Sequence, residues 1–100
     1  MTAVTVAVTA AHISQGTPSD GRSCPVALAI RDAIPGLAFV SVGPACIVIA
    51  AADAPSIALD APPSVGTFVI AFDCGDPAPP FTFTLDPDHP GENEHIEVPF

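Results

Sequence analysis

Proline interrupts this chain at short intervals, and this excludes long helices and long interior strands. The 100 residues include 13 prolines, well above the ordinary share of about 5%. Because proline lacks a backbone N–H and has a fixed φ, it ends helices and interrupts central strands. The uncharged run over residues 33–52 is cut at Pro35-Gly36 and at Gly43-Pro44. We therefore expect buried strands there rather than a membrane-spanning helix.

The chain has enough apolar side chains to form one hydrophobic core. Hydrophobic residues make up 49% of it, which separates it from disordered acidic proteins of similar charge. A length of 100 residues suits one domain and is too short for two domains with separate cores. We expect a compact domain over residues 1–86 and an acidic, flexible tail over residues 87–100.

Alternating and β-branched apolar runs predict four short strands, over residues 2–8, 37–43, 45–51 and 81–86, with residues 56–60 as a candidate for a fifth. A single-turn helix is expected over residues 9–16, with Thr9 as its N-cap. A longer helix is expected after Ser23 or Cys24, with Pro25 in its first turn and Pro35-Gly36 closing it. The predicted fold class is α+β, a single small domain. Its four- or five-stranded sheet is mostly antiparallel, with two main helices packed on one face.

Residues 61–75 carry signals for both a helix and a strand. The run TFVIAF has strand propensity, whereas Pro62 and Pro63 suit the start of a helix. Large apolar residues recur with helical spacing at Val65, Phe68, Val69 and Phe72. Gly75 suits the position just after a helix end. We favour the helix and keep the strand as the alternative.

Several short motifs resemble a group of small uncharacterised proteins from actinobacteria and their phages. They are T-x-x-H-I at 9–13, C-P-V-A-L-A-I-x-D-A-I-P-G at 24–36, S-V-G at 41–43, and F-V-I-A-F-D-x-G followed by P-F-T-F at 80–83. The resemblance covers residues 1–86. It implies a phage or actinobacterial source and a shared fold, but no activity is assigned to the group and no catalytic residue is carried over.

The charge balance limits the classes of partner. The chain has two Lys or Arg residues against 11 Asp or Glu residues, and a net charge of −9. Such a surface repels phosphate backbones and anionic lipid, so direct nucleic-acid binding and membrane docking are disfavoured. We expect a protein partner with a basic surface, and a homo-oligomer is possible. The alternative is that the charges only keep an apolar small protein in solution.

Carboxylates gather in the last third of the sequence. Seven of the 11 lie after residue 72, where no Lys or Arg occurs: Asp73, Asp76, Asp86, Asp88, Glu92, Glu94 and Glu97. This acidic surface is the predicted interaction site, because acidic patches steer basic partners toward them. The cluster DPDHPGENEH matches neither an EF-hand loop nor H-E-x-x-H. No metal site and no cofactor are therefore expected.

Cys24 is the best nucleophile candidate, since a helix N-terminus favours a thiolate. His12 is the histidine of the predicted folded region that could act as its base. The alternative for Cys24 is a small buried residue at a cap position, and His12 could only tie a loop in place. Cys46 and Cys74 stand in apolar segments, and we expect both in the core. No zinc-type Cys pair, phosphate loop or nucleotide-binding fingerprint occurs.

The leading functional hypothesis is a non-enzymatic, acidic protein–protein interaction module. It is expected in the cytoplasm, and a phage-encoded protein would act on a host protein. A small thiol-dependent enzyme using Cys24 and His12 is the first alternative. A self-associating structural component is the second, and it rests on the apolar content and the edge strand near Phe81.

Overall fold

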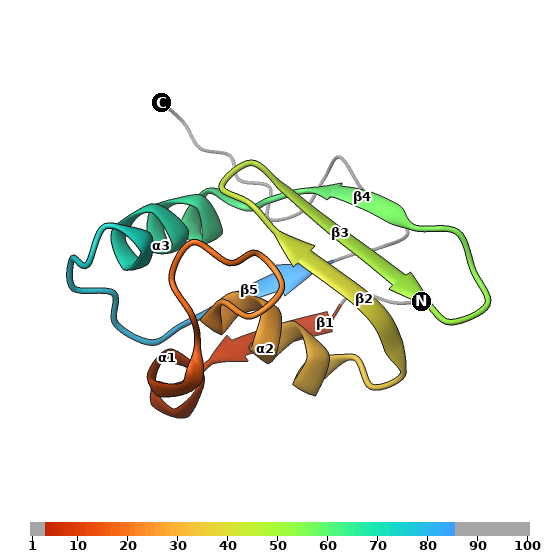
Figure 1. Ribbon diagram of the computed structural model, residues 1–100, viewed down its shortest axis with the longest axis horizontal. Coiled ribbons are helices and arrows are strands. Elements are labelled where there is room, and N and C mark those ends of the chain that lie inside the picture. The colour runs from red at the N-terminus through yellow and green to blue at the C-terminus, as the bar shows by residue number, and fades with distance from the viewer. Residues whose placement is uncertain (1–3, 86–100) are drawn as a thin grey trace.

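The computed structural model describes residues 4–85, and nothing is said of the structure of residues 1–3 and 86–100. The elements run in the order β1 (Val4–Val8), α1 (Ala10–Gln15), α2 (Pro25–Ala33), β2 (Leu37–Val42), β3 (Cys46–Ala51), β4 (Ile57–Asp60), α3 (Pro63–Asp73) and β5 (Phe81–Leu85). Figure 1 shows this order in colour. The predicted α+β class is confirmed, and so are the positions of the strands and helices. The tail predicted over residues 87–100 lies outside the described residues, and so do five of the predicted interaction residues: Asp86, Asp88, Glu92, Glu94 and Glu97.

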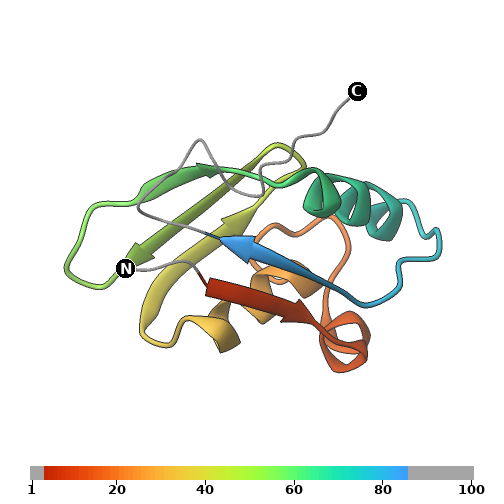
Figure 2. The same cartoon turned by 180° about the vertical axis from the view of Figure 1, so that it is seen from behind.

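The strands form two sheets and not the single sheet that the sequence predicts. β1 and β5 pair antiparallel, with Val6 opposite Phe83, and Figure 2 shows them side by side. β2, β3 and β4 form an antiparallel sheet in that order, with Ile47 between Val42 and Leu59. The prediction was wrong because an alternating pattern tells which side chains face the core. It does not tell which strand lies beside which.

Both sheets contribute to one hydrophobic core. Alternate residues of β1, β2, β3 and β5 are buried, whereas β4 buries Leu59 and leaves Ile57 exposed. The buried residues are Val6, Val8, Phe83 and Leu85 on one sheet and Val40, Val42, Ile47, Ile49 and Leu59 on the other. Helix α2 packs against both β1 and β2 (Figure 1), and its Val26 and Ile30 are fully buried. The helix therefore joins the two sheets through apolar contacts.

The first two helices begin as their sequences predict. Thr9 is the N-cap of α1, where the His12 backbone N–H donates to the Thr9 hydroxyl and the Thr9 backbone N–H donates to His12 Nδ1. Cys24 is the N-cap of α2, and Pro25 occupies the first helical position, where a missing N–H leaves no hydrogen bond unmade.

Helix α3 confirms the helical prediction for residues 61–75. Pro62 precedes it, and its buried face carries Val65, Phe68 and Val69. Gly75 follows with φ +81°, a left-handed conformation that glycine adopts readily. A Cβ on Gly66 would lie 2.6 Å from the Pro44 carbonyl oxygen. Glycine therefore lets α3 lie directly against the turn between β2 and β3.

Candidate protein-binding groove

A row of four phenylalanines joins α3 to β5. The ring centroids of Phe72 and Phe68 are 5.9 Å apart, those of Phe68 and Phe81 are 4.9 Å apart, and those of Phe81 and Phe83 are 5.6 Å apart. Aromatic pairs at such distances attract beyond their simple burial, by about 0.5–1.5 kcal/mol each. The row holds the start of β5 against the helix, although the connecting loop is rich in proline.

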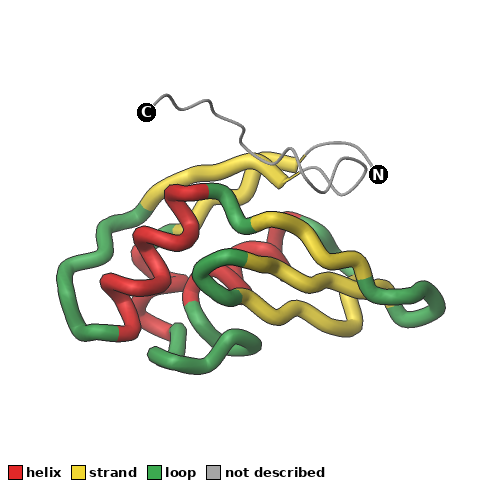
Figure 3. Tube along the Cα trace, turned by 90° about the horizontal axis from the view of Figure 1, so that it is seen from above, coloured by secondary structure: helices red, strands yellow, loops and turns green. Residues whose placement is uncertain are grey.

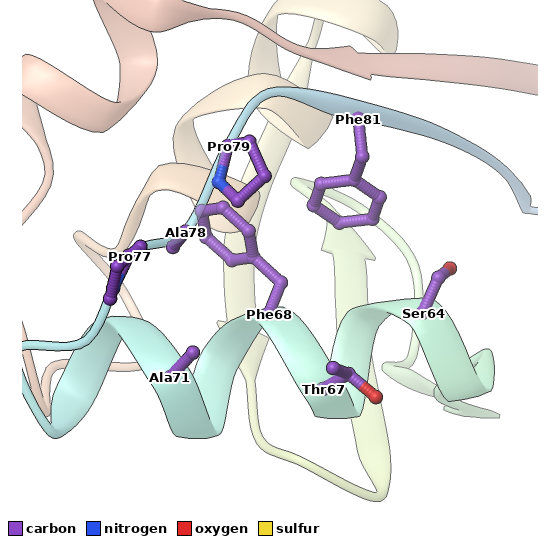
Figure 4. Close-up of a pocket in the computed structure, with 8 residues that line it drawn as sticks. All are labelled: Ser64, Thr67, Phe68, Ala71, Pro77, Ala78, Pro79 and Phe81. Atoms are coloured by element: carbon purple, nitrogen blue, oxygen red, sulfur yellow. The ribbon is translucent and has the colours of Figure 1, made fainter.

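An apolar groove lies beside this row, between α3 and the loop that leads into β5. Its volume is about 290 Å³, and it is lined by Ser64, Thr67, Phe68, Ala71, Pro77, Ala78, Pro79 and Phe81. Figure 4 shows Phe68 directed from α3 toward Pro79, and Phe81 directed from β5 back toward the helix. The side-chain polar atoms of its lining are hydroxyls, so the groove suits an apolar group.

The exposed face of α3 continues the groove and carries no charge. Residues spaced four, three and four apart point to solvent on this face: Pro63, Thr67, Ile70 and Cys74. Ile70 is 56% exposed, which is unusual for a large apolar side chain on a helix. We call these four residues the α3 stripe. The sequence pattern missed it because α3 has apolar residues on its exposed side as well as its buried side, so the pattern shows no sharp division between the two.

Two acidic residues lie at the end of α3, and Asp76 is the one beside the groove. Asp73 and Asp76 are both exposed, and Asp76 immediately precedes Pro77 of the groove. The Ser19 backbone N–H donates to Asp73 Oδ1 at 2.7 Å, which fixes the direction of that side chain. The C-terminal end of a helix is itself partly negative. The acidic rim, defined as Asp73 and Asp76, therefore creates a negative potential at one end of an apolar surface.

The structure places Cys24 near Asp73 rather than near a base. The thiol is 3% exposed and lines a second cavity of about 310 Å³ together with Asp20 and Asp73. Burial raises the pKa of the Cys24 thiol, and the negative charge of Asp73 raises it further. The backbone N–H groups of Ala27 and Val26 lower this pKa, each by less than burial raises it and by more than Asp73 raises it. The thiol is therefore protonated at neutral pH, which opposes a nucleophilic role.

His12 forms its hydrogen bonds at the start of α1 and to α2, and not to Cys24. Its Nδ1 accepts the Thr9 backbone N–H at 3.0 Å, so the proton of the neutral ring is on Nε2. Nε2 lies 2.6 Å from Asp32 Oδ2 and donates to it. Both ring nitrogens are thus engaged, and His12 is not among the residues that line the cavity at Cys24. The arrangement supports a structural role for this histidine.

The other two cysteines contradict the sequence expectation. Cys46 and Cys74 were expected in the core, and both are exposed. Cys46 is the first residue of β3, and its side chain is on the opposite face from the buried Ile47. Cys74 is the last position of the α3 stripe. Apolar neighbours in the sequence do not decide which side of an element a residue occupies.

Neither a metal centre nor a membrane span occurs in the part of the chain that the structure describes. Within residues 4–85, no three His, Cys, Asp or Glu side chains are grouped to hold a metal ion. Over the same range, no helix combines the length and the apolar character needed to cross a bilayer. No protein-family model, curated protein or solved structure matches the chain.

Proposed function

We propose that this protein is a non-enzymatic module that binds a basic protein through α3 and the acidic rim. The observation that carries the proposal is the α3 stripe, an uncharged helix face exposed on a chain with a net charge of −9. The large apolar side chains of a surface helix normally face the core. Contact with a partner would bury the stripe and remove Ile70 from water.

Charge favours a basic partner over the chain itself as the occupant of this surface. A second copy in a symmetric contact would bring another acidic rim to the same interface. Residues 86–100 contain Asp and Glu but no Lys or Arg, so they are also repelled by Asp73 and Asp76. A partner with lysines or arginines is attracted, and its association rate should fall as salt is added.

The environment of Cys24 weighs against the thiol-enzyme alternative. Its pKa is raised by burial and by Asp73, and both nitrogens of His12 have other partners. The resemblance to proteins of actinobacteria and their phages stays a prediction. On that prediction, the partner is a host protein and the module would act by occupying a basic surface.

Binding to immobilised protein, with an actinobacterial lysate as the source of partners, tests the proposal. We expect a basic protein to be retained at about 0.1 M salt and released at about 1 M, because the Debye length falls from about 10 Å to about 3 Å. The partner is then identified, purified and measured against Asp76→Asn. The matched control is Asp53→Asn, which makes the same charge change in the loop between β3 and β4, at the opposite end of the molecule from α3 (Figure 3).

The variants separate a local contact from a general charge effect. Asp76→Asn should weaken binding severalfold, whereas Asp53→Asn should change it little. If both variants weaken binding equally, the acidic rim acts only through the net charge of the protein. A chain ending at Asp86 tests the predicted role of the tail carboxylates, and unchanged binding by that chain would place the interaction on the rim and the stripe. Retention of no basic protein at low salt would contradict the proposal.

A further inference from the structure

We propose that the groove between α3 and β5 is the anchor pocket of this interaction. It takes one apolar side chain from a partner segment in which lysine or arginine flanks that side chain. This inference rests on the proposed function, because it assumes a basic protein partner. It adds the place where the partner is held and the kind of residue that is recognised there.

The dimensions and lining of the groove suit a side chain better than a cofactor. Its volume of about 290 Å³ is just under the range of about 300–1,000 Å³ found for small-molecule pockets. Its walls are the rings of Phe68 and Phe81 and the prolines Pro77 and Pro79, with hydroxyls only at Ser64 and Thr67. A charged or strongly polar ligand would lose hydration here without gaining partners.

The walls of the groove are rigid before any partner binds. Phe68 lies between Phe72 and Phe81 in the aromatic row, so its rotation would break two ring contacts. Prolines at 77, 79 and 80 restrict the loop on the other side. A site whose backbone and side chains are already ordered loses less entropy on binding. Such preformed pockets, filled by one buried side chain, dominate the energy of many interfaces.

The acidic rim fixes the chemistry of the flanking residues. Asp76 directly precedes Pro77 of the groove, and its backbone N–H donates to the Ala71 carbonyl oxygen at 2.8 Å. Asp73 ends α3 with its carboxylate turned toward Ser19 and the cavity at Cys24. A segment that inserts an apolar side chain beside Ala71 and Ala78 brings its neighbouring residues to Asp76. Lysine or arginine there is attracted, and aspartate or glutamate is repelled.

Three synthetic peptides added to the full chain test the inference. The first has the sequence Lys-Lys-Leu-Lys-Lys, the second has glycine in place of leucine, and the third has glutamate in place of every lysine. Binding is followed by NMR through the backbone amides of Thr67, Ala71 and Ala78, which line the groove. We expect the first peptide to bind saturably and on the order of tenfold more tightly than the second, because only it buries a leucine side chain.

A pair of matched variants separates the groove from general attraction. Ala71→Glu places a carboxylate in the groove wall, and Ala58→Glu makes the same change on the exposed strand β4. Both variants add one negative charge, so attraction alone would strengthen lysine-peptide binding in both. We expect Ala71→Glu to abolish the preference for leucine over glycine, and Ala58→Glu to keep it.

The outcomes distinguish the two proposals. If the leucine and glycine peptides bind equally and only the NMR signals of Asp73 and Asp76 shift, the anchor pocket is overturned. The proposal of an acidic binding module would then still stand. Binding of neither lysine peptide would overturn both. Binding of the glutamate peptide as tightly as the lysine peptide would overturn the requirement for flanking basic residues.

Discussion

Helices α2 and α3 differ most on the sides that face water. Helix α2 is buried at Val26, Ala29 and Ile30, and its outer side carries Asp32, whose side chain is 75% exposed and pairs with His12. Helix α3 is also buried on one side, yet its exposed stripe has no charged residue. The difference shows that α2 has the pattern of an ordinary surface helix, with an apolar buried side and a charged exposed side. Helix α3 has the composition of a helix that is covered on a second side.

Isoleucine truncations give the largest expected difference between the two helices. Ile30 in α2 is 0% exposed, so Ile30→Ala should lower the free energy of unfolding by about 2–5 kcal/mol. Ile70→Ala on the α3 stripe should change it by no more than about 0.5 kcal/mol. Urea denaturation measures both. Should Ile30→Ala prevent folding, Ile30→Val is expected to cost about 0.5–1.5 kcal/mol. A loss at Ile70 as large as at Ile30 would show that the stripe is already covered.

The seating of α3 against the β2–β3 turn is tested by adding one methyl group. In Gly66→Ala the new Cβ would lie 2.6 Å from the Pro44 carbonyl oxygen. Overpacking of this kind costs about 1–3 kcal/mol, against a gain of up to about 1 kcal/mol in helix propensity. We expect a net loss of up to about 2 kcal/mol. Gly43→Ala is the control, because its Cβ would meet the Cys46 carbonyl oxygen at an ordinary 3.5 Å. A stabilised Gly66→Ala protein would mean that α3 is not held this closely.

Thiol reactivity compares the start of α2 with the end of α3. Cys24 is buried and has a raised pKa, whereas Cys74 is exposed. Alkylation of the native protein at pH 8, followed by mass spectrometry, should label Cys24 at least about tenfold more slowly, which corresponds to about 1.4 kcal/mol. Comparable rates at the two cysteines would revive the nucleophile hypothesis for Cys24.

The same pKa shift predicts a dependence of stability on pH. Because folding raises the pKa of the Cys24 thiol, its contribution to stability is complete below the ordinary thiol pKa of about 8.5. That contribution is lost as pH rises through the higher pKa of the folded state. The decline should be smaller in Cys24→Ala, which has no thiol to ionise at this position.

Local signals were sufficient to predict the helices and strands. The Cys24-Pro25 pair marks the start of α2, and the Pro62-Pro63 pair with Gly75 marks both ends of α3. These signals depend on residues that are close together in the sequence, so the sequence alone reveals them. For residues 61–75, the spacing of Val65, Phe68 and Val69 outweighed the strand propensity of TFVIAF.

Features that depend on distant residues were not predictable in the same way. The pairing of Val6 with Phe83 divides the strands into two sheets, and no local pattern encodes it. The groove needs Phe68 and Phe81 to meet, which tertiary packing alone decides. Among the acidic residues, Asp73 and Asp76 were identified from charge, but the position of Asp76 beside an apolar groove was not. The burial predicted for Cys46 and Cys74 was wrong because it was inferred from their apolar neighbours in the sequence, which do not determine the direction of the side chain.

The ladder between β1 and β5 also sets when this protein can finish folding during synthesis. β1 ends at Val8, and its partner begins at Phe81. At about 5–20 residues per second, the ribosome needs roughly 4 to 15 s to add the chain between them. Throughout that interval Val6 and Val8 have no partner strand, so a nascent chain on each ribosome exposes an apolar strand edge. Among the described strands, the last to be made is therefore the one that removes the earliest aggregation hazard.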